Sequence, residues 1–263
     1  MKGKAMRVWQ AVALAMLAVS SGALAGAGRT SYTIGVEDIE YYPLHSTRHA
    51  PGKPSEYVGF AREVLDAFAR AEGYNFEYRP MPINRLFDTY FGGDTLDFKY
   101  PDNPLWQAAR RKGATLSYSV PIVLSQEGAL VAPARRGHPL AQIKVLGTVA
   151  GFTPWPYLPT IEAKAMTLTT SASFDSLLRH AIAADIDAVY MNVDVANYQL
   201  GELLKQQGQL VFDPGLPHAS SAFSLSSRRH HEVVAKFDRF LRQHGALLQQ
   251  LRAKYKIAEP ESH

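Results

Sequence analysis

Apolar and polar positions between residues 171 and 204 predict a helix, a buried strand and a second helix. In the first segment the apolar residues recur at spacings of three and four, as on the buried face of an amphipathic helix: Phe174, Leu177, Leu178, Ala181 and Ile182. Ser171 and Ser173 precede this helix, where a side-chain oxygen can cap free amides. The apolar run from Ile186 to Met191 is typical of a buried strand, and a second helix is indicated by Ala196, Leu200, Leu203 and Leu204. This succession indicates an α/β layer, in which ligands lie at the carboxyl ends of the strands.

The same alternation extends over the rest of the chain. Further strands are predicted at residues 32–36, 76–78, 96–100, 115–121, 127–132, 144–149, 166–169, 210–212 and 222–226. Further helices are predicted from Phe60 to a stop near Gly73, over residues 83–91, and as a last helix through residues 233–251. Residues 45–57 are polar and contain proline, so they predict a surface loop. Residues 133–139 have linker character, so we expect a boundary between two lobes close by.

The first 25 residues follow a different pattern from the rest. Lys2, Lys4 and Arg7 form a basic start, residues 8–19 are apolar, and Ala23-Leu24-Ala25 closes the segment with small residues. This pattern predicts a signal peptide over residues 1–25 and a periplasmic location. The alternative is a membrane anchor, but the apolar stretch is shorter than the ~20 residues that a bilayer span needs.

Composition argues against several function classes. The chain has 263 residues, with 28 Lys and Arg against 24 Asp and Glu. Loss of the three basic residues of the predicted signal leaves 25 against 24, a net charge of +1, so no basic field favours nucleic acid. The absence of cysteine excludes disulfides and thiolate metal sites, and we expect no cofactor. The sequence has no nucleophile elbow, zinc-protease motif or phosphate loop, although a Ser/His/Asp set assembled from distant positions stays open.

Four short motifs occur in the order and with the gaps seen in a known family. They are Tyr57-Val58-Gly59-Phe60, Gly93-Asp94-Thr95-Leu96-Asp97, Tyr118-Ser119-Val120-Pro121, and Asp187-Ala188-Val189 with Tyr198 downstream. On these motifs the chain resembles the periplasmic solute-binding proteins of ABC importers, in the group that includes the polar amino acid binders. The resemblance implies an α/β fold of two lobes, of the periplasmic binding protein type II. Each lobe would be a mixed sheet flanked by helices, with two hinge crossings and the ligand in the cleft. Lobe 1 would comprise residues 30–130 and 216–258, and lobe 2 residues 131–215.

The sequence departs from the amino acid binders at two anchor positions that the resemblance implies. An arginine six residues before the Phe-Ser-like motif grips the ligand carboxylate in that family, and here the position is Lys112, next to Arg110 and Arg111. An aspartate that binds the ligand ammonium is replaced by Asn192, which carries no full charge. We therefore expect free α-amino acids not to be high-affinity ligands, unless Asp194 turns inward and compensates.

Aromatic side chains are the first group of candidate ligand contacts. They fall in loops expected to follow strands: Tyr41, Tyr42, Tyr100, Trp106 and Trp155. One interpretation is an aromatic cleft that stacks on a ligand, with Trp106 and Trp155 facing each other from opposite lobes. The other is ordinary packing where loops meet the lobes.

Polar side chains form the second group. Glu37 and Ser171 adjoin predicted strand ends, and Asp102, Asn192 and Asp194 would orient the donors of a ligand. Asp194 could instead cap the following helix. Arg85 could pair with a ligand anion or form a surface ion pair. Thr153 precedes a predicted helix start, where backbone amides can hold an anion or where the side chain simply caps the helix.

These observations predict a secreted solute-binding protein. It would capture a small polar or aromatic solute in an interlobe cleft by hinge closure and present the closed form to a partner. The expected partner is the permease of an ABC importer or a sensor or chemoreceptor domain. We expect a monomer that binds no nucleic acid. Two alternatives stay open, a periplasmic enzyme of the dehydratase type on the same fold and a ligand-free accessory protein.

Overall fold

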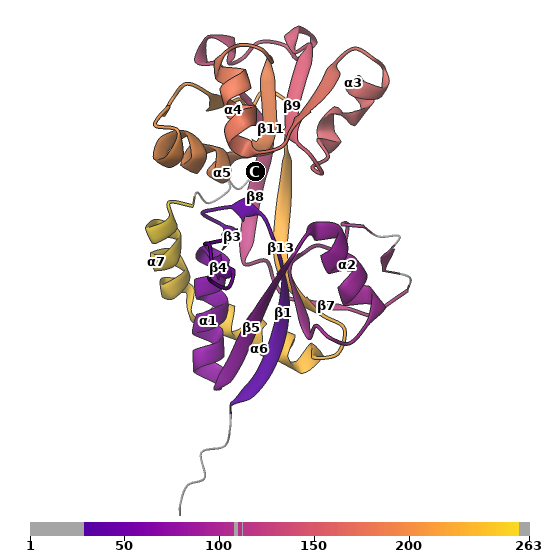
Figure 1. The fold of residues 1–263 in the computed structure, drawn as a ribbon, viewed down its shortest axis with the longest axis vertical. Coiled ribbons are helices and arrows are strands. Elements are labelled where there is room, and N and C mark those ends of the chain that lie inside the picture. Colours follow the sequence, from indigo (N-terminus) through magenta and orange to yellow (C-terminus); the bar gives the residue numbers. More distant parts are fainter. Residues whose placement is uncertain (1–28, 108–109, 112, 258–263) are drawn as a thin grey trace, which may run out of the picture.

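The computed structural model describes residues 29–107, 110–111 and 113–257, so the predicted signal peptide and Lys112 lie outside the described residues. Two α/β lobes are stacked along the long axis of the molecule, and the long strands β8 (Val123–Val131) and β13 (Ala219–Ser227) run between them (Figure 1). This arrangement is the predicted two-lobe fold. Among the described residues no helix combines the length and apolar character that crossing a bilayer requires.

Lobe 1 is built on a parallel sheet. The strand β1 (Thr30–Glu37) lies between β5 (Tyr74–Met81) and β6 (Phe98–Asp102), and β13 adds to β6 in the antiparallel direction. The sheet is accompanied by four helices: α1 (Phe60–Glu72), α2 (Ile83–Gly92), α6 (His231–Gln243) and α7 (Gly245–Tyr255). The helix α1 buries Val64, Leu65 and Phe68 along one face and ends at Gly73, whose φ of 72° suits a residue without a side chain.

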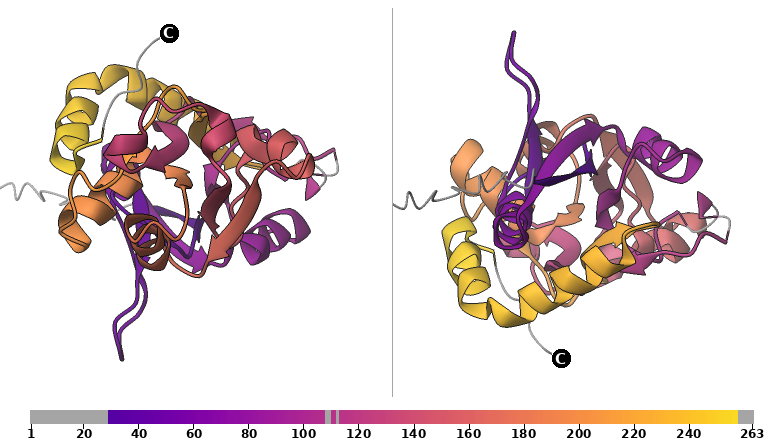
Figure 2. Two further views of the ribbon diagram at one scale, coloured as in Figure 1. Left: turned by 90° about the horizontal axis from the view of Figure 1, so that it is seen from above. Right: turned by 90° about the horizontal axis from the view of Figure 1, so that it is seen from below.

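A small antiparallel sheet replaces the surface loop that was predicted for residues 45–57. It consists of β2 (Glu40–Tyr41), β3 (His45–Arg48) and β4 (Glu56–Val58). The prediction was wrong because polar residues are buried here: His45, Ser46 and Thr47 are all less than a tenth exposed. The hairpin that joins β3 to β4 projects from the body of the molecule (Figure 2).

Lobe 2 has a second parallel sheet. The strand β9 (Val145–Val149) lies between β10 (Thr167–Ser171) and β11 (Ala188–Asn192) and is parallel to both. The helices are α3 (Leu158–Glu162), α4 (Phe174–Ile182) and α5 (Val193–Tyr198), and α5 continues into a wider turn over Gln199–Leu203. The predicted cap of α4 is confirmed, since Ser173 Oγ accepts a hydrogen bond of 3.2 Å from the Ser176 amide.

The strands β8 and β13 connect the lobes. Residues 123–127 of β8 pair with residues 219–223 of β13. The remainder of β8 pairs with β11 and with β12 (Val211–Phe212), whereas the remainder of β13 pairs with β6 and with β7 (Ser117–Tyr118). The two lobe sheets are therefore joined by hydrogen bonds through these strands. The strand β8 ends at Val131 and β13 begins at Ala219, and the lobe limits at residues 131 and 216 stay a prediction.

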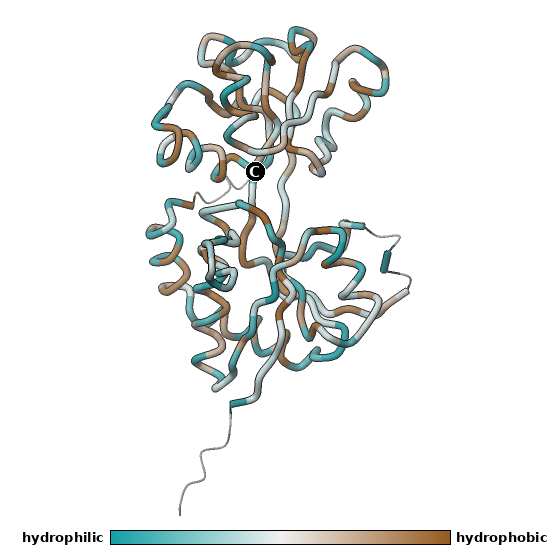
Figure 3. Tube along the Cα trace, in the orientation of Figure 1, coloured by the Kyte–Doolittle hydropathy of each residue, from teal (hydrophilic) through white to brown (hydrophobic). Residues whose placement is uncertain are grey.

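Apolar residues concentrate along the interior of both lobes in Figure 3.

The predicted last helix is two helices, because the backbone breaks at His244 (φ −113°, ψ 37°) between α6 and α7. Phe237 and Phe240 of α6 and Leu251 of α7 all reach the main apolar core, and α7 also contacts α1. A straight helix has one apolar stripe, so the break allows the two segments to direct their apolar faces separately.

Candidate ligand-binding cleft

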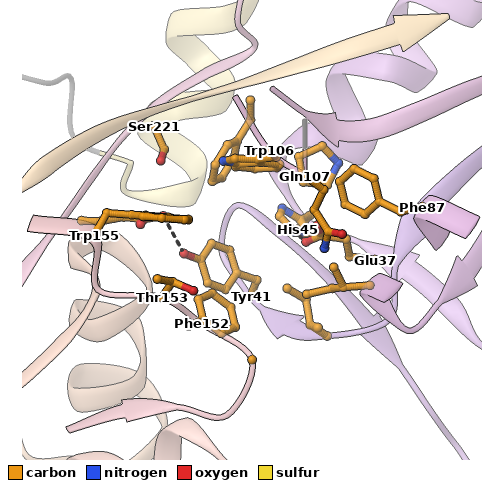
Figure 4. Close-up of a pocket in the computed structure, with 16 residues that line it drawn as sticks. Glu37, Tyr41, His45, Phe87, Trp106, Gln107, Phe152, Thr153, Trp155 and Ser221 are labelled. Carbon is orange, nitrogen blue, oxygen red and sulfur yellow. Dashed lines mark hydrogen bonds and ion pairs between the residues drawn. The ribbon is translucent and has the colours of Figure 1, made fainter. Parts of the chain in front are cut away.

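A cleft with a cavity of about 190 Å³ lies between the lobes (Figure 4). Its aromatic lining is Tyr41, Phe87, Trp106, Phe152, Trp155 and Phe223. Its polar side chains are Glu37, His45, Gln107, Glu127, Thr153 and Ser221. These residues come from both lobes and from the connecting strands, which is the geometry expected of a cleft that changes when the lobes move.

Glu37 and His45 form the lobe 1 side of the cleft. Glu37 is the last residue of β1, so it occupies the carboxyl end of a strand in a parallel sheet. His45 Nε2 lies 3.5 Å from Glu37 Oε2, and the imidazole is 1% exposed. Among the described residues neither ring nitrogen of His45 has a hydrogen-bond partner. A buried imidazole with two unused nitrogens is costly, which favours a polar partner supplied from the cleft.

Glu127 faces the cleft from β8, in register with Asn192 of β11. The Tyr41 hydroxyl, 3.4 Å from Glu127 Oε1, is its hydrogen-bond donor. Burial raises the pKa of Glu127 to about 7, the neighbouring charge of Glu37 adds to this shift, and the bond from Tyr41 opposes it. Burial also raises the pKa of Tyr41 well above its ordinary value, so the tyrosine is a donor at neutral pH.

The aromatic residues form walls on both sides of these polar groups. The Tyr41 ring stacks on Phe152 with centroids 5.8 Å apart, and the Trp106 ring meets Phe223 edge-on at 5.5 Å. Trp155 is 66% exposed at the lobe 2 side (Figure 4). Trp106 and Trp155 thus come from opposite lobes and both line the cleft. An exposed indole at a cleft is available to stack on a ligand.

A buried ion cluster lies behind the lobe 1 wall. Asp102 is fully buried and binds Arg111 Nη2 at 3.0 Å, Lys99 Nζ at 3.3 Å and the Ser226 hydroxyl at 2.7 Å. Arg111 also binds the Tyr118 hydroxyl. Burial lowers the pKa of Lys99, and Asp102 and Glu37 oppose that shift. Asp102 therefore offsets one of the two positive charges of the cluster and does not line the cleft, contrary to its expected role.

Several other predicted contacts lie away from the cleft. Tyr100 is fully buried in the core beside His45. Tyr42 packs against Tyr198 in a separate groove, because consecutive residues of β2 and its turn point in different directions. Arg85 is exposed on α2, and Ser171 pairs with Val149 at the end of β10.

Asn192 and Asp194 are also displaced from the expected ligand position. Asn192 is 1% exposed, and its Oδ1 accepts the Val195 amide at 3.0 Å while its Nδ2 donates to the Ser125 hydroxyl. Asn192, and not Asp194, is therefore the cap of α5. Asp194 lines a different groove, beside Tyr198 and Lys256, so it does not compensate in the cleft for the missing aspartate.

Thr153 lines the cleft, but the anion site predicted at its helix start is not formed. The elements that follow are the short turn Trp155–Tyr157 and the five-residue helix α3. Pro154 and Pro156 have no amide hydrogen, and the Trp155 amide donates to Thr153 O at 2.9 Å. The first amides of this segment are thus absent or used, so they cannot receive an anion.

Sequence reasoning missed Glu127, His45 and the aromatic residues Phe87, Phe152 and Phe223. Glu127 had a usable signal, since it is an acidic residue within a predicted strand close to the predicted lobe crossing. His45 had none, because its segment appeared to be an exposed loop. Within the described residues no group of three or more His, Asp and Glu side chains could hold a metal ion.

Comparison of the sequence with family models and with curated proteins finds no match to either. Solved structures do match. The arginine-, lysine-, histidine-binding protein ArtJ from Geobacillus stearothermophilus is 18% identical with a TM-score of 0.62, over 88% of this chain and 97% of that one. The substrate binding protein of an amino acid ABC transporter is 17% identical with a TM-score of 0.60, over 86% and 98%.

A third structure is the ancestral amino acid-binding protein AncCDT-1, described as a precursor of cyclohexadienyl dehydratase. It is 17% identical with a TM-score of 0.61, over 86% of this chain and 95% of that one. Sequence identities this low show a shared fold but do not show that the proteins bind the same ligand. The chain is therefore similar in overall architecture to two-lobe amino acid-binding proteins.

Proposed function

We propose that this protein captures a small organic solute in the interlobe cleft and closes on it by movement about β8 and β13. The observation that carries the proposal is the composition of the cleft, in which aromatic and polar side chains from both lobes converge on one cavity. Ligand contacts made with both lobes exist only when the lobes are close together, so the ligand stabilises the closed form.

The proposed ligand contacts are Glu37, Tyr41, His45, Trp106, Glu127 and Trp155. The proposed location is the periplasm, on the basis of the signal-like residues 1–25. The proposed partner is the permease of an ABC importer or a sensor domain that recognises the closed form. The fold shared with amino acid-binding proteins supports a solute as the bound molecule.

Native mass spectrometry of freshly purified protein, searched for a co-purified small molecule, tests the proposal. Small-angle scattering should then show a smaller radius of gyration with the recovered molecule than after its removal. A bound molecule that leaves both the radius and the tryptophan emission unchanged would place binding outside the cleft and contradict the proposal.

One observation favours a second candidate, a lyase or dehydratase acting in the same cleft. A carboxyl group with a pKa near 7, as for Glu127, suits general acid–base catalysis at neutral pH. A neighbouring fold is a dehydratase precursor, although that protein is itself described as an amino acid-binding protein. Incubation of the recovered molecule with catalytic amounts of protein separates the candidates, because only an enzyme converts more than one equivalent.

A further inference from the structure

The charge of the cleft limits the kind of ligand that it can take. Among the described residues that line it, the ionisable groups are Glu37, Glu127, His45 and Tyr41, and neither lysine nor arginine is present. Behind the wall, Lys99 and Arg111 share the single carboxylate Asp102, which leaves one positive charge. Set against ionised Glu37 and Glu127, this leaves one net negative charge when His45 is neutral. Because burial raises the pKa of Glu127 to about 7, this count applies above that pH.

The basic groups nearest the cleft are already engaged. Arg111 donates to Asp102, to Tyr118 and to the carbonyls of Asn103 and Trp106. Lys99 is fully buried, and its Nζ donates to the Pro101 carbonyl and lies 4.1 Å from the centroid of Phe87. Neither Lys99 nor Arg111 lines the cleft. A ligand carboxylate that drew on Arg111 would have to displace its buried bonds, and breaking a buried ion pair is strongly unfavourable.

The hydrogen-bond acceptors of the cleft, in contrast, are available to a ligand. His45 lines the cleft, and among the described residues neither of its ring nitrogens has a hydrogen-bond partner. Nε2 lies 3.5 Å from Glu37 Oε2, so in the neutral ring Nδ1 is the nitrogen left to accept a bond from an ammonium group. Within the described part of the chain, the Glu127 carboxylate accepts only the long bond from Tyr41 at 3.4 Å. The faces of Trp106, Trp155 and Phe152 add surfaces that attract an organic cation.

We propose that the solute is a small organic cation without a carboxylate, namely an amine or quaternary ammonium compound with an aromatic or apolar body. Its positive charge lies between Glu37 and Glu127, its donors meet His45, and its body packs against the two indoles. This inference rests on the proposed function and makes it narrower. It also explains why an amino acid is unsuitable, since the carboxylate of a zwitterion would be buried without a partner.

Three probes test the inference; they share a 4-hydroxyphenyl ring and differ in whether they carry an ammonium group, a carboxylate or both. Tyramine is a cation, tyrosine is a zwitterion, and 3-(4-hydroxyphenyl)propionate is an anion. Calorimetric titration of the purified protein at pH 8 with each probe should show tyramine binding about tenfold or more tighter than tyrosine, with the propionate weaker still. Benzyltrimethylammonium, which has no hydrogen-bond donor, measures the contribution of charge and aromatic contact alone.

Two variants test which carboxylates of the cleft pair with the positive charge of tyramine. Glu37→Gln and Glu127→Gln keep the shape of the side chain and remove its charge, and each should weaken tyramine binding about tenfold or more. Glu162→Gln is the matched control, because Glu162 is exposed at the end of α3, away from the cleft, and the substitution changes net charge equally. It should leave tyramine affinity within about twofold.

The outcomes separate the inference from the proposed function. Preference for tyramine that is lost in both cleft variants and kept in the control supports the inference. Tighter binding of tyrosine or of the propionate, with a change in tryptophan emission, overturns the inference and leaves solute capture in place. Lack of any small molecule in the native protein, together with lack of binding by all four probes, overturns both.

Discussion

The Tyr41 hydroxyl lies 3.4 Å from Glu127 Oε1 and joins the small sheet of lobe 1 to the strand that leads into lobe 2. The same tyrosine ring contacts Phe152 and Phe174, which belong to lobe 2, and is 3% exposed. Tyr41 is therefore a contact between the lobes as well as a wall of the cleft. Opening of the cleft must break these contacts, so the charge state of Glu127 bears on both stability and binding.

The first prediction concerns the pH dependence of stability. The pKa of Glu127 is about 7 in the folded protein against an ordinary value of 4.5. Between these values the folded chain holds a proton that the unfolded chain has released, so the contribution of Glu127 to the free energy of unfolding falls as pH rises through about 7. The loss amounts to at most about 3 kcal/mol. Urea denaturation from pH 4.5 to pH 8 measures it.

Glu127→Gln should flatten this part of the profile, whereas Glu162→Gln should retain it. Groups close to Glu127 that also carry charge or titrate are Glu37, Tyr41 and Tyr190. The tyrosines titrate above this range because burial raises the pKa of both. A Glu127→Gln profile as steep as that of the unaltered protein would refute the assignment to Glu127.

The second prediction concerns the indoles of the cleft. The chain has three tryptophans, and Trp9 lies in the predicted signal, so the mature protein would report on Trp106 and Trp155 alone. Trp155 is 66% exposed, and closure on a ligand should remove it from water and shift its emission to shorter wavelength. Trp155→Phe should abolish most of the shift, and Trp106→Phe a smaller part. A full shift in Trp155→Phe would contradict the placement of this indole at the ligand.

The third prediction concerns the buried ion cluster. Asp102→Asn removes the carboxylate that pairs with the buried Lys99 and Arg111 and should reduce the free energy of unfolding by about 3–5 kcal/mol. The matched control is Asp88→Asn, which removes the partner of Arg110 on the surface, where the effect should stay within about 1 kcal/mol. Urea denaturation of both variants measures the difference. Equal effects would show that Asp102 is not the charge that stabilises the cluster.

The fourth prediction concerns Gly59, in the first motif of the sequence. Its φ is 111°, and a Cβ there would lie 2.9 Å from the backbone Cα of His45. Gly59→Ala should therefore displace β3 and lower the free energy of unfolding by about 1–3 kcal/mol. Gly93→Ala is the control, because its backbone is extended and the nearest atom to its Cβ is 4.0 Å away. Tyramine affinity should fall in Gly59→Ala alone, since His45 moves with the strand.

Local patterns in the sequence determined most of the secondary structure and the class of fold. The apolar spacing of residues 174–182, the serine cap at position 173 and the stop at Gly73 each depend on neighbours within a few residues. The same is true of the apolar run that became β11. The order of strands and helices, with its four motifs, was enough to indicate two α/β lobes.

Only the tertiary structure decided which side chains meet in the cleft. Asp102 and Asn192 are polar residues at strand ends, as the sequence pattern predicted, yet Asp102 pairs with buried cations and Asn192 caps a helix. Glu127 and His45 come from segments 82 residues apart and reach the same cavity because β8 and β3 face it. The physical reason is that the direction of a side chain depends on strand pairing and on how the lobes pack. A local pattern states that a position is polar, but the partner that satisfies it comes from a distant part of the chain.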